Sequence, residues 1–553
     1  MILGIHDGTH DAGAALVLDG RLFAACSEER FTRHKGQGGW PSASIAACLQ
    51  RVGARPKDVE KVVFPGVVNP NPGLRLFRKL QSDFKLDEGA FYSPSPSPGD
   101  RLGDWLQFRS PFPRLLGDGR VGRALRLPLQ VALGAQARRE GLVAPVRVEE
   151  HHRCHAASAY WTCPWDEALV LIADGVGDGL ALSAWVGRPS GLRRVGTMPY
   201  PDSYGLLFAT LTGFLGFRPF RHEGKLVGLA ATGDRARIRT PFPFAGPPGQ
   251  RRFTQQLGQG LRPFLAELRR ELDAGATRAD LCAWLQHNVE EDLTALARHY
   301  VERTGLRRFA LAGGVFANVR LNQRIAALGP IFVHPHMGDG GLAAGAALTV
   351  APRREALAHA FLGPEASSTL GDADGDVART MAEALAADQL VGRWEGAMEY
   401  GPRSLGHRSI LAPAHDRAVT QRLNTALDRS DFMPFAPLLL AEDAERWVDG
   451  LANTREAARF MTVTVQAKPE LERLCPAVVH VDGSLRPQLV DSTTPALERT
   501  LRLYRERTGL PAVINTSFNL HEEPIVCSDG DALRTGRAAR LDVLTFGDRS
   551  LRP

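Results

Sequence analysis

Short apolar runs separated by polar loops open the chain. Residues 2–5 form one apolar run, the polar loop 7–11 follows, and a second apolar run covers residues 14–18. An Asp-Gly pair then makes a two-residue hairpin turn before a third run at 22–26. This pattern predicts three strands, with the first polar loop at the end of the first strand.

The same order of runs and turns returns in the middle of the chain. An apolar run at 168–173 is followed by an acid- and glycine-rich loop at 174–179, a second run at 180–186, a Ser-Gly turn and a third run at 192–195. Two such units predict an α/β protein with duplicated halves that face each other across a cleft. Glycines in the loops let backbone N–H groups approach phosphates, and the acids suit a metal or water. Taken singly, each unit equally fits an ordinary hairpin with a polar tip.

A helix and a glycine pair follow the second unit. Apolar residues spaced by three and four over 281–296 predict an amphipathic helix that ends near Gly305. A short strand at 309–311 then leads into Gly313-Gly314 and a further helix. A glycine pair between strand and helix lets a nucleotide lie against the backbone. Many helices begin this way without a nucleotide, so both interpretations stay open.

Two histidines have the spacing of metal ligands. His151 and His155 lie four residues apart at the expected start of a helix, which places them on one face, one turn apart. An open-sided divalent metal site needs a third ligand, usually a carboxylate. Asp339, between a short strand and a helix, is our candidate. The alternative is a partly exposed, histidine-rich helix start.

Two irregular stretches interrupt this scheme, at 69–119 and 240–249. Such excursions are usually surface loops, but they also shape acceptor pockets. Between the two stretches lies a segment rich in aromatic residues, which either stack on an acceptor or fill the core. These residues are Tyr204, Phe208, Phe214 and Phe217.

Composition narrows the class of protein. A chain of 553 residues predicts two to four domains, and 44% hydrophobic with 23% charged residues is typical of a globular protein. No apolar run of about 18 residues and no signal peptide is recognisable, so we expect a cytoplasmic protein. The seven cysteines lack CxxC spacing and are expected to be reduced. The net charge of +6 comes without the dense Lys/Arg tract of nucleic-acid-binding tails, and charge alone does not decide the partner.

Several separated segments resemble a known enzyme family. The HxxxH pair, the strand-Gly-Gly segment and the Gly-Asp-x-Gly turn at 338–341 resemble the tRNA threonylcarbamoyl-transferase subunit, a member of the actin, sugar-kinase and heat-shock ATPase superfamily. Longer segments resemble more closely the O-carbamoyltransferase family of nodulation protein U, cephalosporin carbamoyltransferase and tobramycin carbamoyltransferase. These segments are 9–12, 28–30, 223–230, 398–411, 434–437, 480–483, 515–519 and 523–527.

The resemblance implies a fold and a reaction. It implies an actin-like, duplicated ribonuclease-H-like α/β domain over 1–355, a linker at 356–385 and a YrdC-like α/β domain over 386–553. The C-terminal domain is expected to make carbamoyl adenylate from carbamoyl phosphate and ATP, with Mg²⁺. The N-terminal domain is expected to pass the carbamoyl group to a hydroxyl of a small-molecule acceptor, such as a secondary metabolite or a sugar.

The resemblance also implies which residues bind the substrates. Carbamoyl phosphate carries two negative charges beside its carbonyl, so its site needs cations and oriented donors. The candidates for this site are Arg403, Arg408 and Arg486, with Ser517 and Asn519 as neutral donors. The residues expected to hold the adenosine and phosphates of ATP are Lys225, Gly313, Gly314 and Asn318.

A catalytic pair and a metal ion complete the implied site. His10 is our candidate base for the acceptor hydroxyl, oriented by Asp11, and the alternative is that His10 binds phosphate. Fe(II) or another divalent ion is expected on His151, His155 and Asp339, where it polarises a phosphate or carbonyl oxygen.

Several positions depart from the family pattern. Cations usual before Pro-Phe-Ala-Pro are replaced, so that only Arg429 remains near there, and a usual glycine is Glu522. The other departures are Leu427, Asp428 and Met433 in the same region, His407 for asparagine, and Ala231-Thr232 for Pro-Tyr. Either substitutes serve the first half-reaction, or the donor differs.

Two other functions stay open at this point. One is a tRNA-modifying threonylcarbamoyl enzyme with both halves fused, and the signature over 398–411 argues against it. The other is a degenerate nucleotide-binding scaffold, suggested by the altered region near Arg429. For the carbamoyltransferase we expect no membrane and no nucleic-acid partner, with a homodimer as one option for the assembly.

Overall fold

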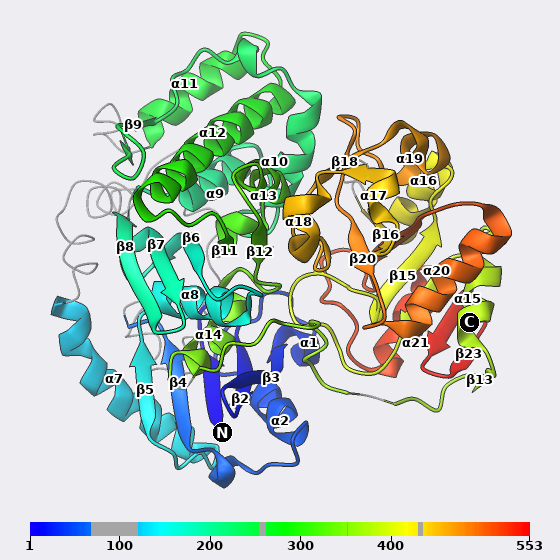
Figure 1. The fold of residues 1–553 in the computed structure, drawn as a ribbon, viewed down its shortest axis with the longest axis horizontal. Helices are drawn as coiled ribbons and strands as arrows, with labels where there is room; N and C mark the ends of the chain where they lie inside the picture. The colour runs from blue at the N-terminus through cyan, green and yellow to red at the C-terminus, as the bar shows by residue number, and fades with distance from the viewer. Residues whose placement is uncertain (68–119, 201, 254–260, 351, 366, 430–434) are drawn as a thin grey trace.

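The computed structural model describes residues 1–67, 120–200, 202–253, 261–350, 352–365, 367–429 and 435–553 (Figure 1). The predicted irregular stretch at 69–119, the substituted Met433 and Pro434 of the Pro-Phe-Ala-Pro segment lie outside the described residues. Within the described residues, no helix combines the length and the apolar character needed to cross a membrane.

The N-terminal sheet contains the three predicted strands and two more. Its strands are β1 (Ile2–His6), β2 (Gly13–Leu18), β3 (Arg21–Ser27), β4 (Lys61–Pro65) and β5 (Val146–Glu149). The order is β3-β2-β1-β4-β5, with β1, β2 and β3 antiparallel in sequence and β4 and β5 added in parallel beside β1. Every residue of β1 is buried, which explains its continuous apolar run.

The second sheet repeats this topology. Its strands are β6 (Ala168–Gly177), β7 (Leu180–Arg188), β8 (Gly191–Pro199), β11 (Phe309–Ala312) and β12 (Ile331–Val333). Strands β6, β7 and β8 are antiparallel in sequence, and β11 and β12 are added in parallel beside β6. The shared order confirms the predicted duplication and the α/β class.

Two helices pack between these sheets. Helix α8 (His151–Thr162) follows the last strand of the first sheet but packs on β6 and β11 of the second. Helix α14 (Leu342–Leu348) follows the second sheet and packs on β1, β2 and β4 of the first. The helices also touch each other at Gly345, where a Cβ would lie 1.9 Å from the carbonyl oxygen of Cys154. Each helix thus packs on the sheet to which it is not directly connected. This arrangement brings the N-terminus of α8 close to the loop before α14.

A helical layer covers the outer face of the second sheet (Figure 1). It contains α9 (Tyr204–Phe214), α10 (Glu223–Leu229), α11 (Arg262–Asp273), α12 (Arg278–Thr304), α13 (Val319–Ala326) and the short strands β9 (Phe244–Ala245) and β10 (Arg252–Phe253). Thr277 and Asp280 form a capping box at the start of α12, and Gly305 ends it with φ of 72°, which confirms the predicted helix.

Most of the aromatic residues proposed for the acceptor pocket belong to the core. Tyr204, Phe208 and Phe214 are buried, and the ring of Tyr204 stacks on Phe244 with centroids 4.2 Å apart. The hydroxyl of Tyr204 donates to Asp292 at 3.1 Å. Of the two interpretations of this segment, core filling is therefore the one that the structure supports.

The C-terminal part is built on a mixed eight-stranded sheet in the order β13-β23-β22-β14-β15-β21-β16-β20. These strands are β13 (Asp372–Ala373), β14 (Val391–Trp394), β15 (Arg408–Pro413), β16 (Ala436–Leu440), β20 (Gln488–Val490), β21 (Val513–Ser517), β22 (Val543–Phe546) and β23 (Arg549–Leu551). Helices α15 (Val377–Ala386) and α20 (Pro495–Thr508) pack together and share a core with several of these strands. The likeness of this part to the YrdC fold stays a prediction.

Smaller elements complete both parts. They are α1 (Glu29–Thr32), α2 (Ser42–Gln50), α7 (Arg120–Arg139), α16 (Arg417–Ala426), α17 (Ala444–Trp447), α18 (Leu451–Ala458), α19 (Pro469–Leu474), α21 (Asp529–Ala538), β17 (Val448–Asp449), β18 (Val465–Ala467) and β19 (Ser484–Leu485). Of the predicted linker 356–385, β13 and α15 are built into the C-terminal part, because α15 buries its apolar face there.

Buried contacts join the two parts. The Arg30 guanidinium donates to the carbonyl oxygen of Gly401 at 2.7 Å. Arg33 donates to the carbonyl oxygens of Pro524 and Ile525, each at 2.7 Å. Cations that bond to the other part's backbone fix the relative position of the two sites described next.

Candidate functional site

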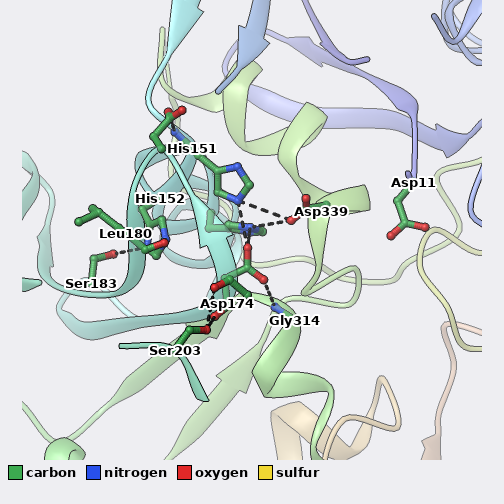
Figure 2. A network of polar contacts seen from close by, with 12 residues as sticks. Asp11, His151, His152, Asp174, Leu180, Ser183, Ser203, Gly314 and Asp339 are labelled. Atoms are coloured by element: carbon green, nitrogen blue, oxygen red, sulfur yellow. Dashed lines mark hydrogen bonds and ion pairs between the residues drawn. The ribbon is translucent and has the colours of Figure 1, made fainter. Parts of the chain in front are cut away.

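Four side chains from three separate segments converge at the N-terminus of α8 (Figure 2). His151 and His155 come from the first turns of α8, Asp174 from β6, and Asp339 from the turn before α14. One ligand atom from each lies within 4.8 Å of the others. The Nε2 atoms of His151 and His155 lie 3.5 and 3.4 Å from Oδ1 of Asp339. The predicted set of three therefore meets, with Asp174 as a fourth member.

The burial of this cluster fits a bound divalent cation. His151 and His155 are 1% and 0% exposed, which excludes the exposed, histidine-rich helix start. Nδ1 of His151 and Nδ1 of His155 are buried without a hydrogen-bond partner among the described residues. Buried polar atoms without partners are costly unless something binds them. Two imidazoles and two carboxylates are a suitable donor set for Fe(II), Zn²⁺ or a similar ion.

Electrostatics in the cluster depend on these contacts. Burial opposes a charge on His151, but Asp339 and Asp174 raise its pKa well above the usual value. Burial and Asp339 oppose ionisation of Asp174, yet its hydrogen bonds with His151 and His155 hold its pKa below the usual range. The carboxylates are thus ionised at neutral pH, in the state that a metal ion requires.

The predicted glycine pair reaches the same cluster. The N–H of Gly314 donates to Oδ1 of Asp174 at 3.0 Å. Gly313 adopts φ of 100°, and a Cβ there would lie 2.2 Å from the carbonyl oxygen of Ala173, so the position requires glycine. Asn318 caps α13 by accepting from the N–H of Leu321 at 3.1 Å. The side chain of Asn318 also exchanges two hydrogen bonds with Gln286, so its polar atoms already have protein partners.

His10 and Asp11 form a pair beside the cluster. Nδ1 of His10 lies 3.1 Å from Oδ2 of Asp11, and its Nε2 lies 3.7 Å from Oδ2 of Asp339. Burial opposes a charge on the ring, but Asp11, Asp339 and Asp174 together raise the pKa of His10 to about 9. The charged form of the ring is therefore favoured as long as Asp174 and Asp339 carry no cation.

A second cluster, in the C-terminal part, consists of three arginines. Arg403 follows β14, Arg429 follows α16, and Arg486 precedes β20. None of them forms an ion pair with a described carboxylate, and Nε of both Arg403 and Arg486 is buried without a partner there. Burial and the charge of Arg429 lower the pKa of Arg403 to about 10, and burial with both other charges lowers that of Arg486 well below its usual value.

Unpaired like charges held together make an anion site. Burial lowers the pKa of Arg429 to about 10 as well. Its guanidinium donates to Oγ1 of Thr516 at 2.8 Å and lies 4.7 Å from the centroid of the Phe435 ring. Three guanidinium groups that repel one another gain most from a ligand with two negative charges. The charge of the cluster is thus complementary to that of a phosphate group.

Buried hydrogen bonds hold the loop that carries Arg403. One oxygen of Glu399 accepts from the backbone N–H groups of Leu405, His407 and Arg408 at 2.8, 2.8 and 3.0 Å. Gln488 donates to the carbonyl oxygen of Leu405 at 2.6 Å. The signature over 398–411 is therefore a turn built around one carboxylate.

The remaining predicted anion ligands lie elsewhere or serve the loops. Arg408 is fully buried, donates to the carbonyl oxygens of Glu395, Gly396 and His407, and lies 4.5 Å from the Trp394 ring. Its donors are thus directed at backbone and not at the arginine cluster. Ser517 lies half-buried at the end of β21. Asn519 donates to the carbonyl oxygens of Leu520 and Glu523.

The family departures have local explanations. The ring of His407 stacks on Phe361 with centroids 3.6 Å apart, and its Nδ1 bonds to the carbonyl oxygen of Ala397 at 2.7 Å. Leu427 is buried in the core, and Asp428 takes a positive φ of 54°.

Glu522 connects the two parts. Its carboxylate accepts from Arg218 at 2.8 Å and bonds to Nε2 of His222 at 3.0 Å. Lys225, expected to bind nucleotide, has Glu522 and Arg429 as its charged neighbours, and burial lowers its pKa. Lys225 therefore lies on the side of the N-terminal part that faces the arginine cluster.

Sequence reasoning missed two members of these clusters. The sequence pattern places Asp174 in an acidic loop without naming a partner for it, although its place after the apolar run 168–173 matches that of Asp7 after the run 2–5. Arg429 was treated as a remnant of a lost cation pair. The repeat in the sequence could have identified Asp174, whereas Arg429 meets Arg403 and Arg486 only through the fold of the sheet.

Comparisons with known proteins identify the family of the chain. The carbamoyltransferase N-terminus family model matches residues 1–74, 123–243 and 252–348, and the carbamoyltransferase C-terminus model matches 382–552. Nodulation protein NolNO of Sinorhizobium fredii is 31% identical over 573 residues, which cover 97% of this chain and 78% of that protein. Nodulation protein U of Azorhizobium caulinodans is 27% identical over 586 residues, which cover 96% of each.

Likeness to solved structures is weaker. HypF of T. kodakarensis is 13% identical, with 63% of this chain and 47% of that chain covered, and its TM-score of 0.35 carries no argument. The assignment rests instead on the two family models, which together span both parts, and on relatives of similar length. On this evidence the chain is an enzyme of the carbamoyltransferase family.

Proposed function

We propose that the protein carbamoylates a hydroxyl of a small molecule in two half-reactions, with carbamoyl phosphate and ATP as co-substrates. The observation that carries the proposal is the cluster of Arg403, Arg429 and Arg486, which has no carboxylate partner among the described residues. Carbamoyl phosphate is a doubly charged acyl phosphate and needs a positively charged site, and this cluster supplies that charge.

The first half-reaction makes carbamoyl adenylate at the arginine cluster. Water releases phosphate from carbamoyl phosphate and leaves carbamate. A carbamate oxygen then attacks the α-phosphorus of ATP, and the bond to pyrophosphate breaks. Arg403, Arg429 and Arg486 hold the phosphate, and Ser517, at the end of β21, is a neutral donor to the same ligand. Mg²⁺ accompanies ATP.

The second half-reaction takes place beside His10 and Asp11. The acceptor oxygen attacks the carbamoyl carbon, the bond to the AMP oxygen breaks, and AMP leaves. His10, whose Nδ1 contacts Asp11, donates from its other ring nitrogen to a phosphoryl oxygen of the adenylate. Asp11, ionised and 40% exposed at its side chain, is the carboxylate that takes the hydroxyl proton. Gly313 and Gly314 allow the backbone to approach the nucleotide.

His151, His155, Asp174 and Asp339 would hold a divalent ion, Fe(II) among the candidates. When bound, it would supply Lewis-acid stabilisation of an oxygen of the adenylate. Asp339 would also orient His10 through its contact with Nε2 of that ring. Burial of the two histidines would keep water away from the cluster. We place the reaction in the cytoplasm, since none of the seven cysteines is in a disulfide.

The test is a transfer assay with carbamoyl phosphate labelled in its carbonyl carbon, ATP, Fe(II) and a panel of hydroxyl compounds. The account expects label in an acid-stable carbamate ester only when ATP is present, with one AMP formed per ester. The Arg486→Met variant should lose transfer. Label transfer without ATP would contradict the adenylate route, and threonine-dependent labelling of tRNA would favour the alternative enzyme.

A further inference from the structure

The linker between the two parts packs against the loop that carries Arg403. Residues 357–364 of the predicted linker form this linker segment. The N–H of Gly363 donates to the carbonyl oxygen of Met398 at 2.9 Å, and the N–H of Met398 donates to that of Pro364 at 3.0 Å. A Cβ at Gly363 would lie 3.0 Å from the carbonyl oxygen of Met398, so the two backbones are in close contact. The linker segment therefore touches the loop where the loop begins.

The linker segment is also bound to the N-terminal part. The N–H of Ala25, in β3, donates to the carbonyl oxygen of Leu362 at 2.9 Å. The guanidinium of Arg51, which follows α2, donates to the carbonyl oxygens of Gly363 at 2.9 Å and Phe361 at 3.2 Å. Hydrogen bonds from a charged donor are stronger than neutral ones. The segment is thus fixed beside the first sheet and offers the loop a firm support.

One aromatic contact joins the linker segment to the end of the same loop. The rings of Phe361 and His407 are nearly parallel, 11° apart, with centroids 3.6 Å apart. Nδ1 of His407 lies 2.7 Å from the carbonyl oxygen of Ala397, which can only accept, so Nδ1 carries a proton. His407 therefore binds the start of the loop at Ala397 and packs on the linker segment as well. Asparagine, the residue of the family pattern at this position, has no ring to stack.

Arg403 needs such support because its neighbours repel it. Burial, and with it the charge of Arg429, lowers the pKa of Arg403, and Arg486 is affected by both other charges in the same way. Without an anion, repulsion between like charges favours positions of Arg403 outside the cluster. Anion affinity falls with the fraction of molecules in which all three cations are in place. Contacts that hold the loop therefore contribute to binding.

We infer that His407 and Phe361 are positioning residues for Arg403, and that their stacked rings raise the affinity of the arginine cluster for a phosphate-bearing ligand. They act through the loop, because neither ring belongs to the cluster. This inference deepens the proposed function and rests on its anion site. It also gives a role to His407, which departs from the family pattern.

The experiment measures binding separately from catalysis. Isothermal titration calorimetry with inorganic phosphate would be performed on the full-length protein, and Arg486→Met would define binding outside the cluster. His407→Asn, Phe361→Leu and the double variant remove the stack, whereas Phe361→Tyr keeps it. Phe64→Leu is the matched control, because Phe64 on β4 is fully buried in a different core cluster and its ring lies 5.8 Å from that of Trp40. Thermal unfolding and the Michaelis constants for pyrophosphate release would be measured on the same proteins.

His407→Asn and Phe361→Leu should each weaken phosphate binding by about fivefold, which is within the range that an aromatic pair supports. The double variant should be no weaker than the single variants, because all three lack the same contact. The Michaelis constant for carbamoyl phosphate should rise in parallel, and more than the constant for ATP. Phe361→Tyr and Phe64→Leu should bind phosphate like wild type, although Phe64→Leu unfolds at a lower temperature.

Unchanged phosphate affinity in both single variants, additive losses in the double variant, or an equal loss in Phe64→Leu would overturn the inference. Phosphate binding by wild type that is no tighter than by Arg486→Met would overturn both the inference and the anion site. Wild type that binds phosphate at the cluster but releases no pyrophosphate would count against the proposed function alone.

Discussion

Oδ2 of Asp174 lies 3.1 Å from Nε2 of His151. His151 begins the helix that follows the first sheet, whereas Asp174 lies in a strand of the second. The other oxygen of Asp174 accepts from the N–H of Gly314. One carboxylate therefore links the histidines of the candidate metal site to the glycine turn that is expected to contact nucleotide (Figure 2). Loss of this carboxylate should affect both the candidate metal site and the glycine turn.

We predict that Asp174→Asn weakens divalent-metal binding by at least about tenfold. An amide is a poorer metal ligand than a carboxylate, and the substitution removes one of the two negative charges beside the histidines. Metal content after dialysis against Fe(II) or Zn²⁺ is the measurement. His152→Gln is the control: His152 is buried next to the cluster, but both its ring nitrogens bond to Ser183 and Leu180. Equal metal content in Asp174→Asn and wild type would remove Asp174 from the site.

Repulsion among the three arginines should lower the free energy of unfolding of the ligand-free protein. Replacing Arg486 by methionine removes a half-buried charge that Arg403 and Arg429 repel. We predict that Arg486→Met raises the free energy of unfolding by about 1 kcal/mol without ligand and abolishes stabilisation by phosphate. Thermal unfolding with and without phosphate measures both effects.

Arg408→Met is the matched control for the cluster. Its guanidinium bonds to carbonyl oxygens inside the fold, so its removal should lower stability by about 2 kcal/mol or more. If Arg486→Met were as destabilising as Arg408→Met, Arg486 would be a structural residue and the anion site would lose its main support.

Glu399 should make the stability of the C-terminal part sensitive to acid. Burial opposes its ionisation, but His407, Arg408 and three backbone N–H groups hold its pKa below the usual 4.5. The contribution is therefore fully present above pH 4.5 and is lost as the pH falls through the lower, folded-state value. Glu399→Gln should lower the unfolding free energy by about 2 kcal/mol at pH 7 and flatten its decline between pH 5 and 3. Urea unfolding at several pH values tests this, and an unchanged slope would contradict it.

Glu522 adopts φ of +63°, where the family pattern has glycine. Alanine and glycine at this position both remove the contacts with Arg218 and His222, but only glycine relieves the strain. We predict that Glu522→Gly is more stable than Glu522→Ala by about 1 kcal/mol. Chemical unfolding of the two variants side by side decides this; equal stability would mean that the turn relaxes.

Much of the N-terminal fold follows from the sequence, because hairpins and amphipathic helices are local. The Asp-Gly turn, the strands around it and the helix ending at Gly305 all lie where the pattern predicts them. The spacing of His151 and His155 likewise fixes their common face through helix geometry alone. The strand β6, however, continues to Gly177 with a register shift after Ala173, and this irregularity carries Asp174 to the metal cluster.

The arginine site was less predictable. Arg403 and Arg408 lie five residues apart in one signature, yet only Arg403 joins the cluster, because the turn around Glu399 ends where β15 begins at Arg408. The core role of the aromatic residues in α9 was equally undecidable, since a helix buried on all sides shows no polar face to locate it. In both cases the answer depends on tertiary packing.

If the C-terminal arginine cluster binds carbamoyl phosphate for adenylate formation, ATP should be cleaved before any acceptor is bound. Pyrophosphate release from ATP would be followed without acceptor, with carbamoyl phosphate omitted or replaced by acetyl phosphate. We predict release that depends on carbamoyl phosphate and is lost in Arg403→Met and Arg486→Met. Release that is independent of carbamoyl phosphate, or that survives both substitutions, would contradict it.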